Sequence, residues 1–387
     1  MTSPKLRFLD CSSNKVSDWK KQSLLKSFHI VKDKQQTDRT ILSIIQGKGT
    51  IPRSETGLDI LSSQKSVDSY LPVRKDDFVI HLRSFQGGFE IANSDGIVSS
   101  AYTMLRGDKE TWPAFFKYYF RLHKFINNNL SIVVEGVRDG KTINISQLSD
   151  VCITVPDIHE QQKIAEFFTA LDEKIQLKVH KKAQLEYLYK SLLEKLYSTT
   201  IDRRPLSKVA TFHSGLTYKP TDVSDSGVIV LRSSNIQNNH IDLTDKVFVD
   251  TNLSSELKTN EGDILMCVRN GSKNLVGKTA LIDSTCKSYT WGAFMMVIRS
   301  KEQTHWVHHF LRSKKFRSQI DSDSNTATIN QITKGMLNEC LIPWPALETR
   351  VNSSKLLDLI ERRIFITERM IFELNSLKKA FMQRMFV

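Results

Sequence analysis

The sequence lacks long apolar runs and a cysteine framework. No stretch approaches the roughly 18 apolar residues that a membrane-spanning helix needs, and the N-terminal residues lack the apolar core of a secretory signal. The five cysteines, Cys11, Cys152, Cys267, Cys286 and Cys340, are odd in number and widely spaced, without a C-x-x-C pair. This pattern argues against a disulfide framework or a zinc site. We therefore expect a cytoplasmic protein.

Motifs for nucleotide, methyl-donor and metal chemistry are also missing. There is no G-x-G-x-x-G, and no Asn/Asp-Pro-Pro-aromatic run. Gly277-Lys278-Thr279 resembles the end of a phosphate loop, but Ser272 occupies the position of the required first glycine. Gly140-Lys141-Thr142 fails in the same way, with Glu135 at that position. The histidines have no acidic or cysteine companions at ligand spacing. We predict no catalytic centre, no metal site and no cofactor.

Glycine and proline are absent from Asp157 to Arg204, so nothing interrupts a long helix there. Asp157 follows a proline and can cap the first turn, with Glu160 completing a capping box. Apolar residues recur at heptad spacing through this stretch, with one break at Lys178 and Lys182. A heptad seam requires a partner helix.

The partner lies in the same chain, because the pattern returns after a shift of 189 residues. Leu171-Asp172-Glu173-Lys174-Ile175 becomes Ile360-Glu361-Arg362-Arg363-Ile364, with the charge sign kept at Asp172 and Lys174. We predict an internal duplication whose two long helices pair as an antiparallel coiled coil. The residues predicted to pair are Ile164, Phe168, Leu171, Ile175, Leu185, Leu192, Leu357, Ile360, Ile364, Leu374 and Phe381.

The repeat extends outside the helices. The apolar runs 151–156 and 340–345 both end in proline and read as final strands that lead into the long helices. Phe78–Arg83 and Ile264–Arg269 are apolar strands that end in arginine before a glycine-containing loop. We predict an α+β fold with two similar mixed domains, a pseudo-two-fold repeat, and the domains at opposite ends of the helix pair. The predicted segments are a first domain at 1–157, a helix at 158–200, a second domain at 201–346 and a helix at 347–387.

Polar loops after the predicted strands suggest DNA contact. They combine arginine, amide and hydroxyl side chains with glycine, which lets the backbone approach a phosphate. Arginine pairs with guanine, and asparagine or glutamine with adenine, in the major groove. Any one such loop is more often ordinary surface, but the pattern repeats in two segments that share the excess basic charge, in a chain of net charge +13. The candidate DNA-binding residues are Arg83, Ser84, Gln86, Tyr218, Lys219, Arg232, Ser234, Asn235, Arg269, Asn270, Ser272 and Lys273.

The run from Pro156 to Ile175, with Glu160-Gln161-Gln162-Lys163-Ile164-Ala165, resembles the central conserved region of type I restriction-modification specificity (S) subunits. Similar resemblances occur at Pro4–Phe8 with Trp19-Lys20, at Leu231–Ile236 and at Leu374–Phe386. The resemblance implies two target-recognition domains that read the halves of a split DNA target, separated by two helices that set the gap. The second helix departs from the family pattern, with Thr349–Ser354 in place of E-Q-Q-K-I-A.

The resemblance also implies the partners. A specificity subunit binds double-stranded DNA and is not itself catalytic. It docks two modification (methyltransferase) subunits, which use S-adenosylmethionine to methylate adenine, and recruits restriction subunits, which cleave DNA using ATP. S-adenosylmethionine, ATP and Mg²⁺ would belong to those partners.

Two other functions remain open from the sequence. One is a coiled-coil scaffold that binds only proteins, for which the basic charge provides solubility. The other is a nuclease or methyltransferase of unfamiliar form. Steeply salt-dependent binding to duplex DNA would exclude the scaffold, and turnover by the chain alone would favour the enzyme.

Overall fold

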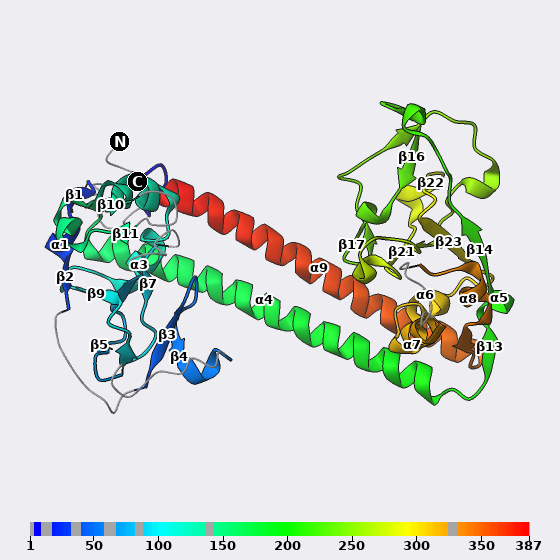
Figure 1. The fold of residues 1–387 in the computed structure, drawn as a ribbon, viewed down its shortest axis with the longest axis horizontal. Helices are drawn as coiled ribbons and strands as arrows, with labels where there is room; N and C mark the ends of the chain where they lie inside the picture. Colours follow the sequence, from blue (N-terminus) through cyan, green and yellow to red (C-terminus); the bar gives the residue numbers. More distant parts are fainter. Residues whose placement is uncertain are drawn as a thin grey trace. The chain divides into compact units, whose positions relative to one another are not determined.

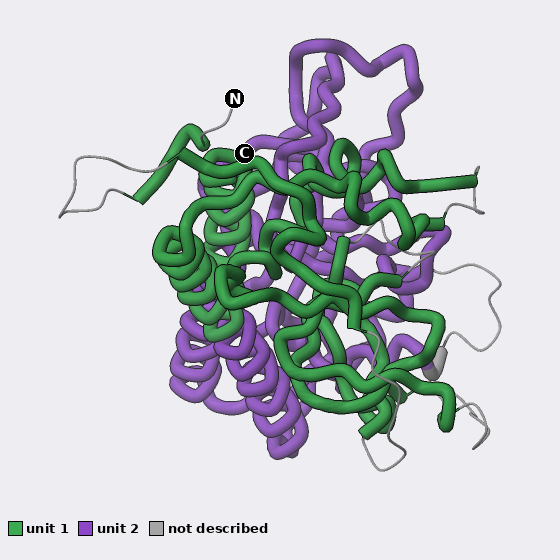
Figure 2. Tube along the Cα trace, turned by 90° about the vertical axis from the view of Figure 1, so that its left-hand side faces the viewer, with its two compact units in different colours: residues 1–178, 370–387 green, residues 179–369 purple. Residues whose placement is uncertain are grey.

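The computed structural model describes residues 4–8, 18–31, 40–57, 67–81, 88–136, 142–323 and 331–386 of the chain. The chain forms two compact units, coloured separately in Figure 2. Unit 1 contains residues 1–178 and 370–387, and unit 2 contains residues 179–369. Each unit therefore holds a segment of both long helices, α4 (Ile158–Thr199) and α9 (Leu347–Met385) (Figure 1). The predicted mixed fold with two long helices is confirmed.

The two long helices begin at the residues predicted for them and end close to the predicted limits. Asp157 caps α4, because its Oδ1 accepts the Glu160 N–H at 3.0 Å. The Glu160 carboxylate accepts two hydrogen bonds from the Arg7 guanidinium, at 2.9 and 2.5 Å. The compact units divide both helices, whereas the sequence assigned each helix to a segment of its own. The four-segment division stays a prediction.

The helices run antiparallel, and each unit supplies one contact that sets their register. In unit 1, Lys378 of α9 donates to Asp172 of α4 at 2.6 Å. In unit 2, Lys182 of α4 donates to Glu368 of α9 at 2.9 Å. Asp172 precedes Lys182 in α4, whereas its partner Lys378 follows Glu368 in α9, so the two helices run in opposite directions. This is the orientation that the sequence predicted.

The predicted pairing residues are buried to different degrees. Ile164, Phe168, Leu171, Ile175, Leu357 and Ile360 are buried, while Leu185, Leu192, Ile364, Leu374 and Phe381 are partly buried. Leu193 and Tyr197 of α4 are buried as well, although neither was among the residues predicted to pair. The heptad pattern missed them because this part of α4 packs on the core of unit 2 as well as on α9. The Tyr197 hydroxyl, for example, donates to the Trp306 carbonyl at 2.7 Å.

Unit 1 is built on a four-stranded antiparallel sheet with the order β2-β9-β6-β7. Aromatic side chains fill its core, where the Phe28, Phe78 and Phe120 rings meet edge to face or tilted. The strands are β1 (Lys20–Ser23), β2 (Phe28–Ile30), β3 (Leu42–Ile45), β4 (Gly49–Pro52), β5 (Leu71–Val73), β6 (Phe78–His81), β7 (Glu90–Ile91), β8 (Gly96–Val98), β9 (Tyr102–Gly107), β10 (Val134–Glu135), β11 (Thr142–Ile143) and β12 (Cys152–Val155). The short helices are α1 (Leu24–Ser27), η1 (Arg53–Glu55), α3 (Pro113–Tyr119), η3 (Phe125–Asn129), η4 (Leu130–Val133) and η6 (Ile145–Asp150).

Unit 2 contains a sheet of the same kind, with the order β14-β23-β20-β21, and a second four-stranded sheet, β15-β19-β16-β22. The strands are β13 (Arg203–Pro205), β14 (Ala210–Ser214), β15 (Val223–Ser224), β16 (Val228–Leu231), β17 (Ile236–Gln237), β18 (His240–Ile241), β19 (Phe248–Val249), β20 (Ile264–Cys267), β21 (Thr279–Leu281), β22 (Thr290–Trp291), β23 (Met295–Ser300) and β24 (Leu341–Pro343). The short helices are α5 (Leu206–Val209), η7 (Pro220–Asp222), η8 (Ser233–Asn235), η9 (Ser255–Leu257), η10 (Lys273–Leu275), η11 (Ser284–Cys286), α6 (Trp306–Phe310), α7 (Lys314–Asp323) and α8 (Lys334–Glu339).

The two units repeat one design down to a buried ion pair. In unit 1, Asp77 precedes β6 and binds Arg106 of β9 at 2.7 Å. In unit 2, Asp263 precedes β20 and binds Arg299 of β23 at 3.0 Å. Each aspartate also accepts the backbone N–H three residues before it, at 2.8 Å. An antiparallel pair leads into each long helix, β1 with β12 and β13 with β24. These matches support the predicted two-domain repeat.

No helix in the described ranges has a segment apolar and uncharged enough to cross a membrane.

Candidate nucleic-acid interface

A surface cavity of about 640 Å³ in unit 2 brings together several of the predicted DNA-binding residues. Tyr218, Arg232 and Ser234 line it, together with Phe294. These residues come from the loop after β14, the turn η8 after β16, and the turn between β22 and β23. Residues that are up to 76 positions apart in the chain thus share one surface.

A close backbone approach positions Tyr218 beside the β22–β23 turn. The Leu216 N–H donates to the Trp291 carbonyl at 2.7 Å. A Cβ on Gly215 would lie 2.0 Å from the Gly292 carbonyl oxygen, so only glycine allows this approach. Lys219, the next candidate, is exposed, and its N–H donates to Asp222 at the end of η7.

Asn235 stabilises the turn η8 from inside and is not exposed on its surface. Asn235 is fully buried, and its Oδ1 accepts the Arg232 N–H at 2.8 Å. Its Nδ2 donates to the carbonyls of Asp242 and Asp245 at 2.9 and 2.7 Å. An asparagine whose amide is committed in this way cannot contact a base edge without unfolding the turn. We therefore correct its predicted role and assign Asn235 to shaping the loop.

Arg232 and Ser234 are the members of this turn that reach the surface. The Arg232 guanidinium forms an ion pair with the exposed Asp245 at 2.7 Å. An exposed pair of this kind is worth at most about 1 kcal/mol, so a phosphate can compete for the arginine. Ser234 is exposed beside it.

The loop after β20 contributes a second group of exposed polar residues. Asn270 joins this loop to η8, because its Nδ2 donates to Ser233 Oγ at 3.3 Å and its Oδ1 accepts the Ser272 N–H at 3.0 Å. Arg269, Ser272 and Lys273 are exposed. Lys273 has no carboxylate partner within the ranges that the structure describes. The loop therefore offers two cations and a hydroxyl to solvent.

Phe294 is a candidate that the sequence reasoning missed. Its side chain is 58% exposed, and the Arg269 guanidinium lies 5.4 Å from the centre of its ring. An exposed aromatic ring beside an arginine suits stacking on a nucleic-acid base. Phe294 lies directly before the strand β23, which begins at Met295. Gly292, two residues before Phe294, was the available signal for a turn.

The equivalent unit 1 loop carries the predicted residues Arg83, Ser84 and Gln86, which lie outside the described residues. The structure describes the residues on either side of this loop. The strand β6 ends at His81, and the chain re-enters at the buried Phe89 and Glu90. Glu90 binds Arg121 at 2.5 Å and accepts the Gly47 N–H at 2.8 Å.

A cluster of histidines in unit 2 resembles a metal site, but two of its three members, His309 and Glu361, are already bound by protein groups. His308, His309 and Glu361 present ligand atoms within 4.8 Å of one another. However, the Arg312 guanidinium binds Glu361 and supplies the positive charge there. His309 uses both ring nitrogens, one with the Tyr189 hydroxyl at 2.8 Å and one with Asp358 at 3.0 Å. The acids lie on α9, 49 residues or more after the histidines, so no short sequence motif indicated that these residues meet.

The pKa values in this cluster are consistent with a structural role. Burial lowers the pKa of His308 to about 4, so its imidazole is neutral near pH 7. Burial also opposes ionisation of Glu361, but hydrogen bonding with His308 and the charge of Arg312 outweigh it and lower the pKa of Glu361 to about 2. A neutral imidazole beside an ionised, arginine-bound carboxylate links α6 to α9.

Comparison with known proteins decides between the possible families. Residues 17–187 match the family model of the type I restriction modification DNA specificity domain. Over these residues the chain is similar to type I specificity domains. The predicted resemblance to type I specificity subunits is confirmed. The matched range includes the sheet of unit 1 and α4 as far as residue 187.

Two curated specificity subunits match the chain over 188 residues. The type I restriction enzyme StySPI specificity subunit of Salmonella potsdam is 31% identical, and the EcoKI specificity subunit of Escherichia coli (strain K12) is 32% identical. The aligned part is 46% of this chain and 40% of each relative, so the chain matches less than half the length of either.

Two solved structures share the fold over nearly the whole chain. The S subunit from M. genitalium has a TM-score of 0.65 and 14% identity, covering 100% of this chain and 99% of its own. A chain from a structure of type I restriction-modification complex assembly and conformational transition has a TM-score of 0.54 and 16% identity, covering 97% and 99%. At these identities the likeness concerns the fold.

Proposed function

We propose that this chain is the DNA-recognition subunit of a type I restriction-modification complex. Unit 1 and unit 2 each read one half of a split target, and the paired helices set the distance between the halves. The single observation that carries the proposal is the repeat, because the same sheet order and the same buried Asp–Arg pair occur in both units. A duplicated scaffold with different loops suits two different half-targets.

The exposed residues of unit 2 support DNA contact there. Tyr218 and Phe294 provide rings that line one cavity, and the Arg269 guanidinium lies beside the Phe294 ring. Lys219, Ser272 and Lys273 are exposed nearby in the sequence. Phosphate contacts position a protein on DNA, and side chains at base edges specify the sequence. We assign the lysines to phosphate contact and Arg269 to base edges, with Asn270 holding the loop in place beside it.

Apolar residues on the outer faces of the helices support docking of modification subunits. Leu177 and Phe372 in unit 1 are 70% and 73% exposed, and Tyr187 and Leu359 in unit 2 are 76% and 61% exposed. Large apolar side chains at such exposure are costly in water and favour a protein partner. Two docking sites, one per unit, fit two modification subunits, with restriction subunits recruited in turn.

On this proposal the chain itself is not an enzyme. S-adenosylmethionine, ATP and Mg²⁺ act in the partner subunits, and the assembled complex works in the cytoplasm. Incubating the purified chain with DNA, S-adenosylmethionine and Mg²⁺ tests this division, and turnover without partners would contradict it.

The bipartite reading is tested by footprinting the assembled complex on DNA that contains its target, once methylation mapping of the host genome has identified that target. We expect two protected patches separated by an unprotected gap. Replacing Arg269 by Ala should relax one half-site and leave the other unchanged. Equal loss at both half-sites would contradict the assignment of unit 2 to one half.

Phe294→Ala provides the matched test of stacking. Because the ring is exposed, we expect its loss to leave folding intact and to weaken DNA binding roughly tenfold, the effect of one lost base–aromatic contact. Ile201→Ala, which removes an exposed apolar side chain of unit 2 that lines neither the cavity nor the docking surface, is the control. Binding that is independent of salt and of both variants would favour the protein-only scaffold instead.

A further inference from the structure

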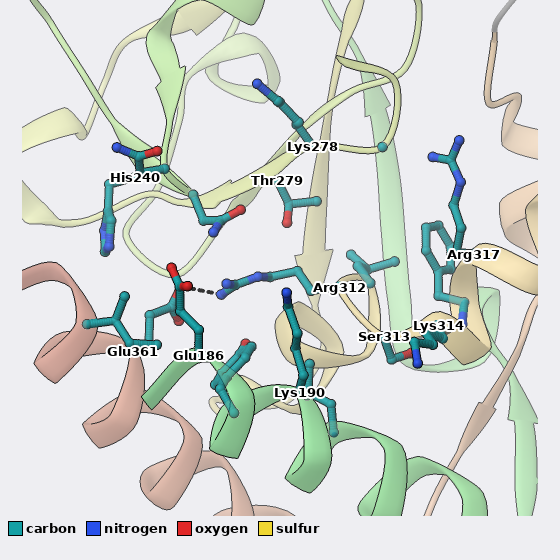
Figure 3. Close-up of a pocket in the computed structure, with 18 of the residues that line it drawn as sticks. Glu186, Lys190, His240, Lys278, Thr279, Arg312, Ser313, Lys314, Arg317 and Glu361 are labelled. Carbon is teal, nitrogen blue, oxygen red and sulfur yellow. Dashed lines mark hydrogen bonds and ion pairs between the residues drawn. The ribbon is translucent and has the colours of Figure 1, made fainter. Parts of the chain in front are cut away.

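A second cavity in unit 2 lies between the sheet domain and the long helices. It has a volume of about 600 Å³, and α4, α9, the start of α7, the turn before β18 and the loop before β21 enclose it (Figure 3). It adjoins the DNA-contact surface along the chain, since Asn238 and Asn239 follow the turn η8, and Asn274 follows the exposed loop after β20. The DNA-reading proposal does not use this cavity.

The acids of this cavity are paired, while several of its cations are not. Glu361 binds Arg312, and Glu368 binds Lys182 and Asn238. Lys190, Lys278 and Lys314 line the cavity without a carboxylate partner among the residues that the structure describes. Even with Glu186, which is 3.8 Å from Lys182, the cavity keeps an excess of positive charge.

A buried hydroxyl without a partner points into the same space. Thr279 is 1% exposed, and its Oγ1 makes no hydrogen bond within the described parts of the protein. Figure 3 shows this oxygen directed into the cavity, on the side facing Lys190 of α4. Leaving a buried hydroxyl unpaired costs roughly 1–3 kcal/mol. A ligand that accepts a hydrogen bond at this position would recover that cost.

Gly277-Lys278-Thr279 supplies one wall of the cavity, which gives this motif a role that the sequence reasoning rejected. It is not a phosphate loop, because Thr279 begins the strand β21 rather than a helix. Gly277 has a φ of +88°, which favours glycine and turns the chain so that Thr279 enters β21. The lysine and threonine thus flank the cavity without wrapping a ligand in backbone amides.

Unit 1 contains a counterpart at the equivalent place. A cavity of about 520 Å³ is lined by Arg121, Lys124 and Lys379. Lys379 corresponds to Lys190 under the shift of 189 residues, and Arg121 lies in the segment that matches the one containing Arg312. A basic cavity beside a long helix therefore occurs in each unit, so it belongs to the repeated fold rather than to one loop.

We propose that the unit 2 cavity is a binding site for phosphate groups. Lys190 and Lys278 supply the charge, and the Thr279 hydroxyl donates a hydrogen bond to a phosphate oxygen. Three unneutralised ammonium groups match more than one negative charge, which a single carboxylate does not provide. A terminal phosphate of a nucleotide or two neighbouring phosphates of a DNA backbone does provide it.

The first experiment uses pyrophosphate as the probe. Calorimetric titration of the full chain at constant ionic strength should show binding, and Thr279→Val and Lys190→Ala should each raise the Kd about tenfold or more, as expected for charge-assisted hydrogen bonds. Thr279→Val should not lower the melting temperature without pyrophosphate, because the hydroxyl that it removes has no partner. Lys287→Ala, at an exposed lysine outside the cavity, is the charge-matched control.

The second experiment separates a nucleotide from the DNA backbone, and only this arm rests on the proposed function. The double variant Lys190→Ala/Lys278→Ala is titrated with a long duplex at several salt concentrations. A slope of log K against log salt reduced by about 1 to 2 relative to wild type and Lys287→Ala assigns the site to backbone phosphates. Lost pyrophosphate binding with an unchanged slope assigns it to a free phosphate compound.

The outcomes that overturn the site differ from those that overturn the DNA-reading proposal. Pyrophosphate affinity and salt slope both unchanged in the cavity variants would refute the phosphate site. A wild-type chain in its complex that binds no DNA would refute the proposed function, while the pyrophosphate titration would still decide the cavity.

Discussion

At the scale of single residues, sequence patterns identified loops better than they identified side-chain roles. Asn235 was predicted to read DNA because it follows arginine and serine in a polar cluster, and the structure buries it as the brace of η8. Phe294 was overlooked because it adjoins an apolar strand, and it is exposed. Burial depends on packing between distant segments, which composition within one loop does not report. Arg269 and Lys273, predicted to contact DNA from a loop that contains glycine, are exposed.

We expect Asn235→Ala to destabilise unit 2 by about 2–3 kcal/mol, because it leaves the Arg232 N–H and two carbonyls without their buried partner. Chemical denaturation measures the change. Asn252→Ala, at an exposed position in the same unit, should change stability by less than about 0.5 kcal/mol. Equal stability of the two variants would show that the turn does not depend on this amide.

At the scale of elements, the long helices were the most predictable feature. Three signals specify where α4 begins and which of its faces is buried: a capping aspartate, a heptad seam, and a stretch without glycine or proline. The seam failed only near Leu193 and Tyr197, where α4 meets α6 of unit 2 as well as α9. A periodicity describes one partner face, so a helix that contacts two partners departs from it.

Leu357 and Leu359, two residues apart on α9, provide a matched test of helix pairing. Leu357 is fully buried in the unit 2 core, and Leu359 is 61% exposed. Leu357→Ala should lower the free energy of unfolding by about 3 kcal/mol through lost burial and a cavity. Leu359→Ala should cost under about 0.5 kcal/mol. Urea denaturation followed by circular dichroism distinguishes them, and similar losses would contradict the packing of α9.

The histidine cluster between α6 and α9 makes the stability of unit 2 depend on pH. The pKa of His308 is lowered from 6.5 to about 4 by burial, so the unfolded chain takes up a proton first as the pH falls below 6.5. Stability is therefore lost progressively between pH 7 and pH 4, by roughly 2 kcal/mol at pH 5. His309, whose pKa burial also lowers, acts in the same direction.

Other groups facing His308 modify this dependence. Hydrogen bonding to Asp358 raises the pKa of His305. Protonated His305 therefore stabilises the folded state below pH 6.5, which offsets part of the stability lost through His308. Glu361, with its pKa lowered to about 2, keeps its contribution until the pH falls below 4.5. Urea denaturation at pH 7 and pH 5 measures the net effect. It should shrink in His308→Gln and persist in His180→Gln, at an exposed position on α4. A pH dependence that His308→Gln leaves unchanged would refute the assignment.

At the scale of the whole molecule, the repeat was predictable because duplication leaves matched residues in both halves. The matched charge signs in the long helices and the two runs ending in proline pointed to it, while the buried Asp–Arg pairs became visible only in the folded units. What could not be predicted is that the compact units divide the helices. Each unit needs a segment of the other half's sequence to complete its core.

This division predicts the effect of removing residues 370–387. Met385 and Phe386 are buried in unit 1, where the Phe386 ring lies 5.3 Å from that of Phe115 and 5.7 Å from that of Phe168. Their loss should remove most amide hydrogen-exchange protection from unit 1, whereas residues 179–369 stay protected because their unit is complete. Phe372→Ala, an exposed substitution in the same segment, is the control, and equal loss in both units would contradict the division.

The position of Phe386 also bears on how the chain is made. A ribosome releases Trp19 early, yet the ring that packs against it at 6.4 Å belongs to a residue synthesised 367 positions later. Unit 2 has all its residues once position 369 has emerged from the ribosome. Unit 2 can therefore complete its fold before unit 1, although its synthesis begins later. A product cut short during translation would therefore never present a finished first unit, and interrupted synthesis could not release a reader with two working halves.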